Sequence, residues 1–264
     1  MKDIIFVKEN GVATIKLNRP GHANAFSMEM IKSWISILEE VRDSNDIKVL
    51  VLTGVGKAFC AGGDITSMRE GQGFIKQNSK EDSIDLNSLG LFRKNSLWKY
   101  IQRIPLLLQE IDIPVIAAMN GHAIGAGLDM ALMCDVRFAS KDAKFGTGYI
   151  NMGLVPGDGS AYFLPRIIGV DKALDLLWTG DVISAEKAES IGLVTRIYNP
   201  QYLMEAVYNY CEKLVQQPQT ALRMTKRSLL QSLEMNLKSS LDLVSSHMSI
   251  VTELEDYKEK INQK

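Results

Sequence analysis

The chain contains few of the side chains that bind metals or form disulfide bonds. Its 264 residues include only three histidines and three cysteines, and no two of either type have metal-ligand spacing. The cysteines are Cys60, Cys134 and Cys211, which cannot all pair with one another and form no Cys-x-x-Cys motif. We therefore predict free thiols, a reducing compartment and no structural or catalytic metal site.

The chain also lacks an excess of charge of one sign. Lysine and arginine number 30 against 31 aspartates and glutamates, a net charge of −1, so no general attraction to nucleic acid or to an anionic membrane is expected. The apolar run at residues 4–7 is too short for a secretory signal, and we expect a cytoplasmic protein. A length of 264 residues with 46% hydrophobic residues predicts one large domain, or one domain with an appendage.

Hydrophobic patterning predicts strands that alternate with helices, which is typical of an α/β fold. A turn at residues 9–11 separates two strand-like runs and favours a hairpin, and Ser27 is placed to cap a helix. The predicted strands are residues 4–8, 12–18 and 48–53, and the predicted helices are 27–43, 91–112 with an interruption at Pro105, and 233–261. The polar stretch 69–90 is consistent with a mobile lid or with an insertion without function.

Residues 114–129, PVIAAMNGHAIGAGLD, form an apolar strand followed by a glycine-rich turn and an acid. If Ala126 opens a helix, its backbone N–H can hold negative charge, and Asp129 lies on the same helical face, three residues further on. Small residues at such a turn also serve close packing alone. The spacing of Gly121, Gly125 and Gly127 does not match a dinucleotide-binding fingerprint.

A second glycine-rich loop, at residues 60–64, repeats this arrangement. Its sequence is CAGGD, and Asp64 is placed to cap a following helix. Two such loops could supply two convergent N–H donors, which is what an enolate or a tetrahedral oxyanion requires.

Several motifs in order along the chain resemble those of the enoyl-CoA hydratase/isomerase (crotonase) family. They include Asn24-Ala-Phe26, the loops at 57–65 and 114–129, Phe145-Gly146 and Gly153-Leu-Val-Pro-Gly157. The resemblance implies a spiral of ββα units at residues 1–197 and a helical region at 198–264 that forms homotrimers, often as dimers of trimers. It implies an acyl-coenzyme A thioester as substrate, with coenzyme A entering only as part of the substrate and no separate cofactor.

The same resemblance implies roles for individual residues. Gly63 and Ala126 correspond to the two oxyanion-hole amides, and Asp129 and Tyr149 to the two catalytic acids. The implied binding positions for substrate and coenzyme A are Ala23, Ala25, Lys57, Ala61, Gly62, Asp64 and Ile65. Lys57 could contact a phosphate of the coenzyme, or could be an ordinary solvated loop lysine.

Tyr149 departs from the pattern of typical hydratases, which carry glutamate at this position. A neutral tyrosine is a poor general base, whereas one carboxylate can both remove and return a proton. Asp158 could supply a second acid, or could cap a helix that starts near Gly159. Enoyl-CoA hydratase with Asp129 as the principal acid/base is the leading hypothesis, double-bond isomerase the near alternative, and decarboxylase or hydrolase further ones. RNA binding, known for one branch of the family, is the non-enzymatic alternative.

Overall fold

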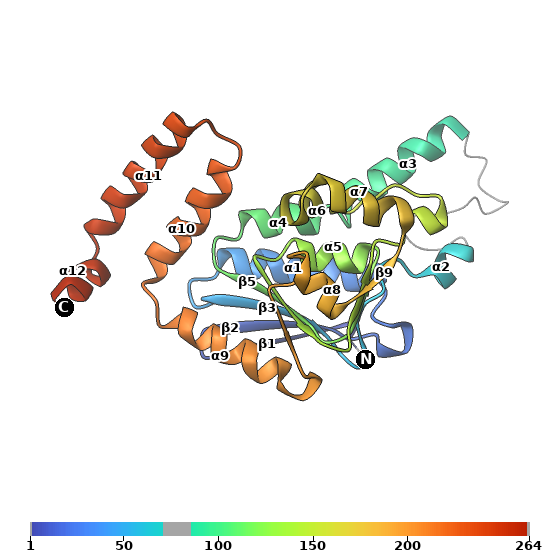
Figure 1. The fold of residues 1–264 in the computed structure, drawn as a ribbon, viewed down its shortest axis with the longest axis horizontal. Helices are drawn as coiled ribbons and strands as arrows, with labels where there is room; N and C mark the ends of the chain where they lie inside the picture. The colour runs from blue at the N-terminus through green and yellow to red at the C-terminus, as the bar shows by residue number, and fades with distance from the viewer. Residues whose placement is uncertain (1, 71–85, 263–264) are drawn as a thin grey trace.

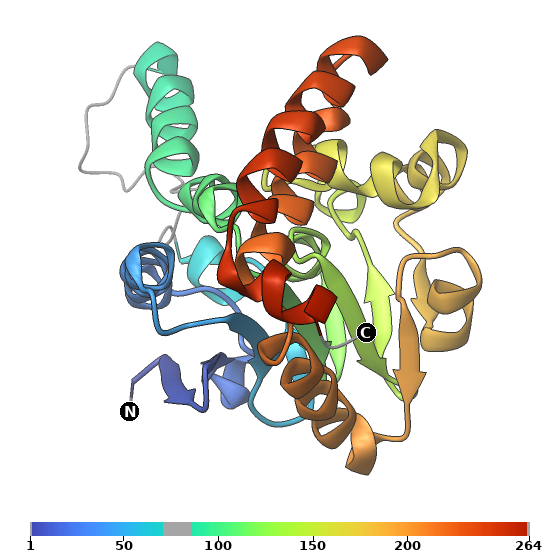
Figure 2. The same cartoon turned by 90° about the vertical axis from the view of Figure 1, so that its left-hand side faces the viewer.

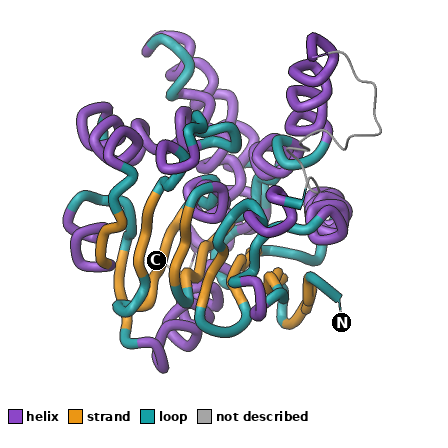
Figure 3. The backbone as a smooth tube through the Cα atoms, turned by 90° about the vertical axis from the view of Figure 1, so that its right-hand side faces the viewer, coloured by secondary structure: helices purple, strands orange, loops and turns teal. Residues whose placement is uncertain are grey.

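The computed structural model describes residues 2–70 and 86–262, which form an α/β fold with two sheets (Figure 3). The larger sheet has the strand order β1-β2-β3-β5-β7-β10, and the smaller has the order β4-β6-β8-β9. The strands of the larger sheet are β1 (Ile4–Glu9), β2 (Val12–Leu17), β3 (Val49–Gly54), β5 (Val115–Met119), β7 (Val136–Ser140) and β10 (Arg196–Tyr198). Those of the smaller sheet are β4 (Ala58–Cys60), β6 (His122–Ile124), β8 (Lys144–Gly146) and β9 (Val182–Ser184).

Strands β3 to β8 alternate between the two sheets. Each of the pairs β3–β4, β5–β6 and β7–β8 places its first strand in the larger sheet and its second in the smaller, and helices follow each pair. These helices are α2 (Ile65–Arg69), α3 (Leu86–Lys99), α4 (Arg103–Glu110), α5 (Ala126–Leu132), α6 (Ser160–Ile168) and α7 (Val170–Thr179). The repeated strand–strand–helix order confirms the predicted spiral of ββα units.

The remaining helices lie outside these three units. They are α1 (Met28–Asp43), α8 (Ala185–Ser190), α9 (Leu203–Val215), α10 (Gln219–Ser232), α11 (Leu237–Thr252) and α12 (Glu255–Asn262), with short 3-10 turns at Pro20–His22, Ile150–Met152 and Pro200–Tyr202.

The central strands of the larger sheet are buried on both faces, because helices cover both sides (Figure 1). On one face Leu50 and Leu52 of β3 join the main core with α1, α4, α5 and α6. On the other face Val49 and Val51 pack against α9, whose Val207 is completely buried. The alternation along β3 thus accounts for a three-layer arrangement, with the sheet between α9 and the other helices.

Local sequence signals account for several elements. β1 and β2 pair as the predicted antiparallel hairpin, and Ser27 caps α1 by accepting a hydrogen bond from the backbone N–H of Met30 at 2.9 Å. Asp64 likewise caps α2 through the N–H of Ser67. These three predictions are confirmed. Each depends only on residues close together in the chain, which is why local sequence signals are enough to make it.

Two predicted helices differ from the structure, and one predicted segment is not tested by it. The predicted helix 91–112 is two helices, α3 and α4, separated at residues 100–102, and Pro105 sits in the first turn of α4, where no helical N–H bond is lost. The predicted helix 233–261 is interrupted after Thr252, where the N–H groups of Glu253 and Leu254 bond three residues back. The predicted lid at 69–90 falls largely outside the described residues.

The C-terminal helices α10 and α11 form an antiparallel pair that projects from the body (Figures 1 and 2). Lys226 of α10 pairs with Asp135 at 2.7 Å, and Arg227 pairs with Asp112 at 2.5 Å. Large apolar side chains on this helical pair are exposed, among them Leu229, Leu237, Leu241 and Met248. The predicted domain boundary between residues 197 and 198 and the predicted homotrimer stay predictions. Helix α9 follows that boundary in the chain, yet it is part of the core.

Candidate active site

The loops that follow three neighbouring strands of the smaller sheet converge at one edge. Strands β4, β6 and β8 are parallel, with Ala58 opposite His122 and Ile124 opposite Gly146, so their carboxyl ends point the same way. Ligands bind preferentially at this end of parallel strands. Gly63 follows β4, Ala126 follows β6 and Tyr149 follows β8, so residues 86 positions apart in sequence share one site.

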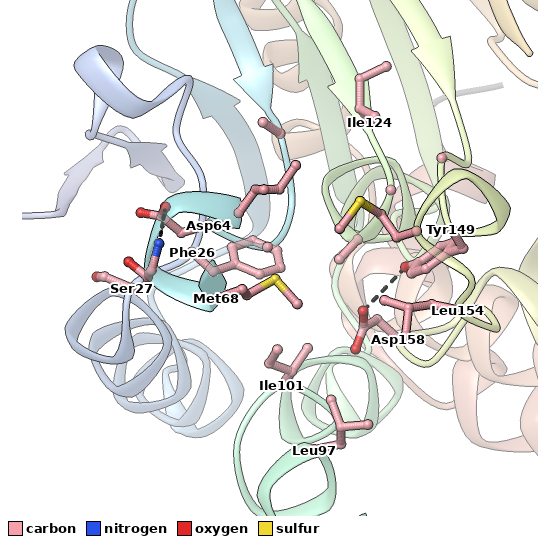
Figure 4. Close-up of a pocket in the computed structure, with 18 of the residues that line it drawn as sticks. Phe26, Ser27, Asp64, Met68, Leu97, Ile101, Ile124, Tyr149, Leu154 and Asp158 are labelled. Atoms are coloured by element: carbon pink, nitrogen blue, oxygen red, sulfur yellow. Dashed lines mark hydrogen bonds between the residues drawn. The ribbon is translucent and has the colours of Figure 1, made fainter. Parts of the chain in front are cut away.

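A cavity of about 360 Å³ lies at this edge, large enough for part of a small-molecule ligand (Figure 4). Its lining is mostly apolar, and Figure 4 shows Tyr149 and Asp158 across the cavity from Phe26 and Met68. The lining residues are Phe26, Ser27, Met28, Ala61, Gly63, Asp64, Ile65, Ser67, Met68, Leu97, Ile101, Ile124, Gly125, Ala126, Thr147, Gly148, Tyr149, Met152, Leu154 and Asp158.

Gly63 and Ala126 both line the cavity, and within the described residues neither backbone N–H donates to a protein acceptor. Ala126 is the first residue of α5, where a helix leaves its N–H groups free and carries partial positive charge. The two loops are in direct contact, because a Cβ added to Gly62 would lie 2.9 Å from the Ala126 nitrogen. The cavity therefore has two available N–H donors in adjoining loops.

Asp158 is the acid whose side chain reaches the cavity from an almost fully buried position, with 7% of its surface exposed. Its Oδ2 lies 3.2 Å from the Tyr149 hydroxyl, and its buried Oδ1 has no hydrogen-bond partner. Burial, together with the nearby charge of Asp129, raises the pKa of Asp158 to about 7. The alternative that Asp158 caps the next helix is wrong, since α6 has no side-chain cap from its own loop.

Asp129 is completely buried and is not among the residues that line the cavity. Its carboxylate accepts hydrogen bonds from the Tyr149 hydroxyl at 2.8 Å, from the Ser160 N–H at 3.0 Å and from the Ser160 hydroxyl. Asp129 thereby accepts the hydrogen bond of the first N–H of α6. This is the capping role that local sequence signals suggested for Asp158. Burial raises the pKa of Asp129 to about 6, while the bonds from Ser160 and Tyr149 act in the opposite direction.

The proposed binding positions divide into two groups. Ala61, Asp64 and Ile65 line the cavity, and Asp64 is held by Arg19 at 3.2 Å. Hydrogen bonds to Ser67 and Arg19 hold the pKa of Asp64 below its usual range against the effect of burial. The other four positions, Ala23, Ala25, Lys57 and Gly62, lie outside the cavity lining, with Ala23 and Lys57 exposed. Their contact with coenzyme A stays a prediction.

Two residues that organise the site had no individual role in the sequence-based prediction. Ser160 donates twice to Asp129 from 31 positions away, a contact that no local pattern signals. Asn24 is completely buried, and its side-chain amide donates to the carbonyl oxygens of Val55 and Ala58, at 3.0 and 2.8 Å, next to the loop at 60–64. The Asn24-Ala-Phe26 motif was part of the resemblance to the family. The motif alone did not predict that the Asn24 side chain holds the backbone next to this loop.

The described residues contain no cluster of three or more histidine, cysteine, aspartate or glutamate side chains able to hold a metal ion. In the same part of the chain, the helices are too short or too polar to cross a bilayer. The fold and cavity thus define an α/β protein with two glycine-rich loops and a buried pair of aspartates at one ligand-sized site.

Comparisons with known proteins agree with this class. The family model described as enoyl-CoA hydratase/isomerase matches residues 7–263. A crotonyl-CoA hydratase of Syntrophomonas wolfei is 30% identical over 259 residues, covering 98% of this chain and 93% of the relative. A 1,2-epoxyphenylacetyl-CoA isomerase of Escherichia coli K12 is 29% identical over 262 residues, covering 99% and 95%.

Solved structures show the same architecture. The crystal structure of an enoyl-CoA hydratase from Bacillus anthracis superimposes with a TM-score of 0.87 at 28% identity, covering 98% of this chain and 95% of that one. The chain belongs to the enoyl-CoA hydratase/isomerase family and has the crotonase fold. Members with this fold include both hydratases and isomerases, so membership alone leaves the reaction to be argued from the site.

Proposed function

We propose that this protein acts on an acyl-coenzyme A thioester, that the N–H groups of Gly63 and Ala126 stabilise its enolate, and that Asp158 exchanges the proton. The thioester carbonyl oxygen would accept both N–H hydrogen bonds, which strengthen as negative charge develops on that oxygen. The observation that carries the proposal is the unpartnered Oδ1 of Asp158, buried at the same cavity as the two amides.

Double-bond isomerisation is the reaction that this arrangement supports best. Of the two aspartates that line the cavity, Asp64 is held by Arg19, and Asp158 lies next to the tyrosine that replaces the second acid. Isomerisation needs one group to move one proton. Asp158 would take a proton from the α-carbon of a 3-enoyl thioester, and the C–H electrons would move onto the carbonyl oxygen. The enolate electrons would then form a new C–H bond at the γ-carbon with the proton returned by Asp158, giving the 2-enoyl thioester.

Hydration is the second candidate, favoured by the relatives named hydratases. It would require Asp158 to activate water while a second group supplies a proton to the α-carbon. Asp129 is not at the cavity wall, and burial beside Asp129 and Asp158 raises the pKa of Tyr149, which makes its hydroxyl a weak acid.

Incubation with two substrates tests the proposal. The purified protein is given crotonyl-CoA and, separately, a 3-enoyl-CoA, and the conjugated-thioester absorbance is followed while products are identified by mass. Appearance of conjugated 2-enoyl-CoA from the 3-enoyl substrate, with little 3-hydroxyacyl-CoA from crotonyl-CoA, supports isomerisation. Rapid formation of 3-hydroxyacyl-CoA from crotonyl-CoA instead establishes the second candidate, and no reaction of either thioester contradicts both.

A further inference from the structure

The hydroxyl of Tyr149 stands between two buried carboxylates. Its oxygen lies 2.8 Å from Oδ2 of Asp129 and 3.2 Å from Oδ2 of Asp158. A phenol has a single hydrogen to donate. When both aspartates are ionised, they therefore compete for one hydrogen.

The competition is unequal. Asp129 also receives the Ser160 N–H and the Ser160 hydroxyl, so its negative charge is well supported, and it lies at the shorter distance from Tyr149. Asp158 has no other donor, because its Oδ1 is unpartnered, and neither aspartate pairs with a cation among the described residues. The geometry therefore favours donation from Tyr149 to Asp129 and leaves ionised Asp158 poorly stabilised.

Protonation of Asp158 relieves this competition. A protonated Oδ2 can donate to the Tyr149 oxygen, while the Tyr149 hydrogen stays with Asp129, and the three groups then form one consistent chain of hydrogen bonds. We propose that Asp129 sets the strength of Asp158 as a proton acceptor by competing with it for the hydroxyl hydrogen of Tyr149. This inference rests on the proposed function, in which Asp158 is the acceptor, and makes Asp129 a positioning residue that acts through Tyr149.

The electrostatics at these residues agree with the geometry. Burial is the largest cause of the raised pKa of Asp158, the charge of Asp129 raises it further, and the bond from Tyr149 lowers it. Removing the Asp129 charge should therefore make Asp158 easier to ionise. Removing the Tyr149 hydroxyl as well should undo part of this change, because the hydrogen that the Asp129 substitution frees for Asp158 is then gone.

The test follows protonation directly by infrared spectroscopy of the substrate-free protein. The C=O stretch of the protonated Asp158 carboxyl is assigned as the band that D158N loses, and its pH midpoint is compared among variants. We expect D129N to lower the midpoint by about one pH unit or more, and D129N/Y149F to leave it higher than in D129N alone. Y208F is the matched control, because it removes a tyrosine hydroxyl of α9, on the other face of the larger sheet, whose partner is Thr14, and it should leave the midpoint unchanged.

The outcomes separate this inference from the proposed function. A midpoint that D129N does not lower, or that is the same in D129N and D129N/Y149F, overturns the inference even if D158N has lost turnover. If D129N does not fold, D129A and D129A/Y149F make the same comparison, and equal midpoints in these two variants contradict the inference. Full turnover by D158N overturns the proposed function whatever the midpoints are.

Discussion

Gly127 packs directly against the backbone of Cys60. A Cβ built on Gly127 would lie 2.1 Å from the Cys60 carbonyl oxygen, closer than real Cβ atoms approach. Cys60 ends β4 and Gly127 is the second residue of α5, so this contact joins the two loops that carry Gly63 and Ala126. The separation of the two N–H donors thus depends on a glycine that lines no part of the cavity itself.

Gly127→Ala should therefore lower kcat by about 10²-fold or more, because it displaces one N–H donor from the oxyanion. Steady-state kinetics on the preferred thioester measures the effect, with thermal unfolding recorded alongside to separate loss of fold from loss of rate. Gly21→Ala is the control, since nothing lies within 4 Å of its added Cβ. Normal turnover by the Gly127 variant would show that the loop contact does not position the donors.

Asp158→Asn should lower kcat by about 10²- to 10⁴-fold, the usual contribution of a general acid–base group, with little change in substrate affinity. Asp129→Asn should cost less, since Asp129 lies behind the cavity wall. Turnover of both variants is compared with that of Asp171→Asn, an exposed aspartate. The reverse order, in which Asp129→Asn abolishes turnover and Asp158→Asn retains it, would make Asp129 the group that meets the substrate.

The activity should rise with pH through about 7. A proton acceptor works in its ionised form, and burial raises the pKa of Asp158 to about 7, so kcat/KM should fall as the pH is lowered below that value. The pH profile of kcat/KM for the free enzyme measures this. A profile that stays flat between pH 5 and 8, a range of about three pH units that includes the expected midpoint, would exclude a proton acceptor that titrates near pH 7.

Asp158 should also reduce stability at alkaline pH. Its folded-state pKa of about 7 lies above the ordinary value of 3.8, so its stabilising contribution is complete below about pH 4 and is lost as the pH rises to 7. Asp158→Asn should therefore be more stable than the parent at pH 8, on the order of 2 kcal/mol, and the advantage should shrink toward pH 4. Denaturant unfolding at both pH values measures it, with Asp181→Asn as an exposed control. A constant difference across this range would contradict a raised pKa.

Asn24→Ala should destabilise the loop that carries Gly63. Asn24 has a positive φ of 56° and is completely buried, and its side chain bonds to the carbonyl oxygens of Val55 and Ala58 and to the N–H of Arg19. Loss of these bonds should cost about 2 kcal/mol or more in the free energy of unfolding. Asn24→Gly tolerates the same φ, so the difference between the two variants measures the backbone contribution. Equal stability of Asn24→Ala and the parent would refute the role of the side chain.

The sequence predicts those parts of the fold that depend on near neighbours. The hairpin at the N-terminus, the Ser27 cap and the start of α5 at Ala126 all follow from turn and cap signals a few residues long. The break between α11 and α12 follows Thr252, where no glycine or proline marks the end. No local sequence signal therefore predicts this break.

The arrangement of the acids was harder to predict. The sequence places Asp158 immediately before Gly159, where a cap is the ordinary local role, yet the N–H of Ser160 bonds to Asp129. That contact spans 31 residues and exists only because α5 and α6 pack together in the fold. A pattern in the chain can therefore nominate Asp129, Tyr149 and Asp158, but their relative positions depend on the tertiary structure.

The attachment of α10 to the body has a consequence for the response of the protein to salt. This helix buries no residue completely, and three ion pairs link it to the body: Lys226 with Asp135, and both Arg223 and Arg227 with Asp112. The Arg227 side chain is 50% exposed, so about 1 M salt, with a screening length of about 3 Å, should weaken its pair, while Lys226, 11% exposed, is better shielded. The apolar core is not weakened in this way, so rising ionic strength should loosen the terminal helices well before it affects the site.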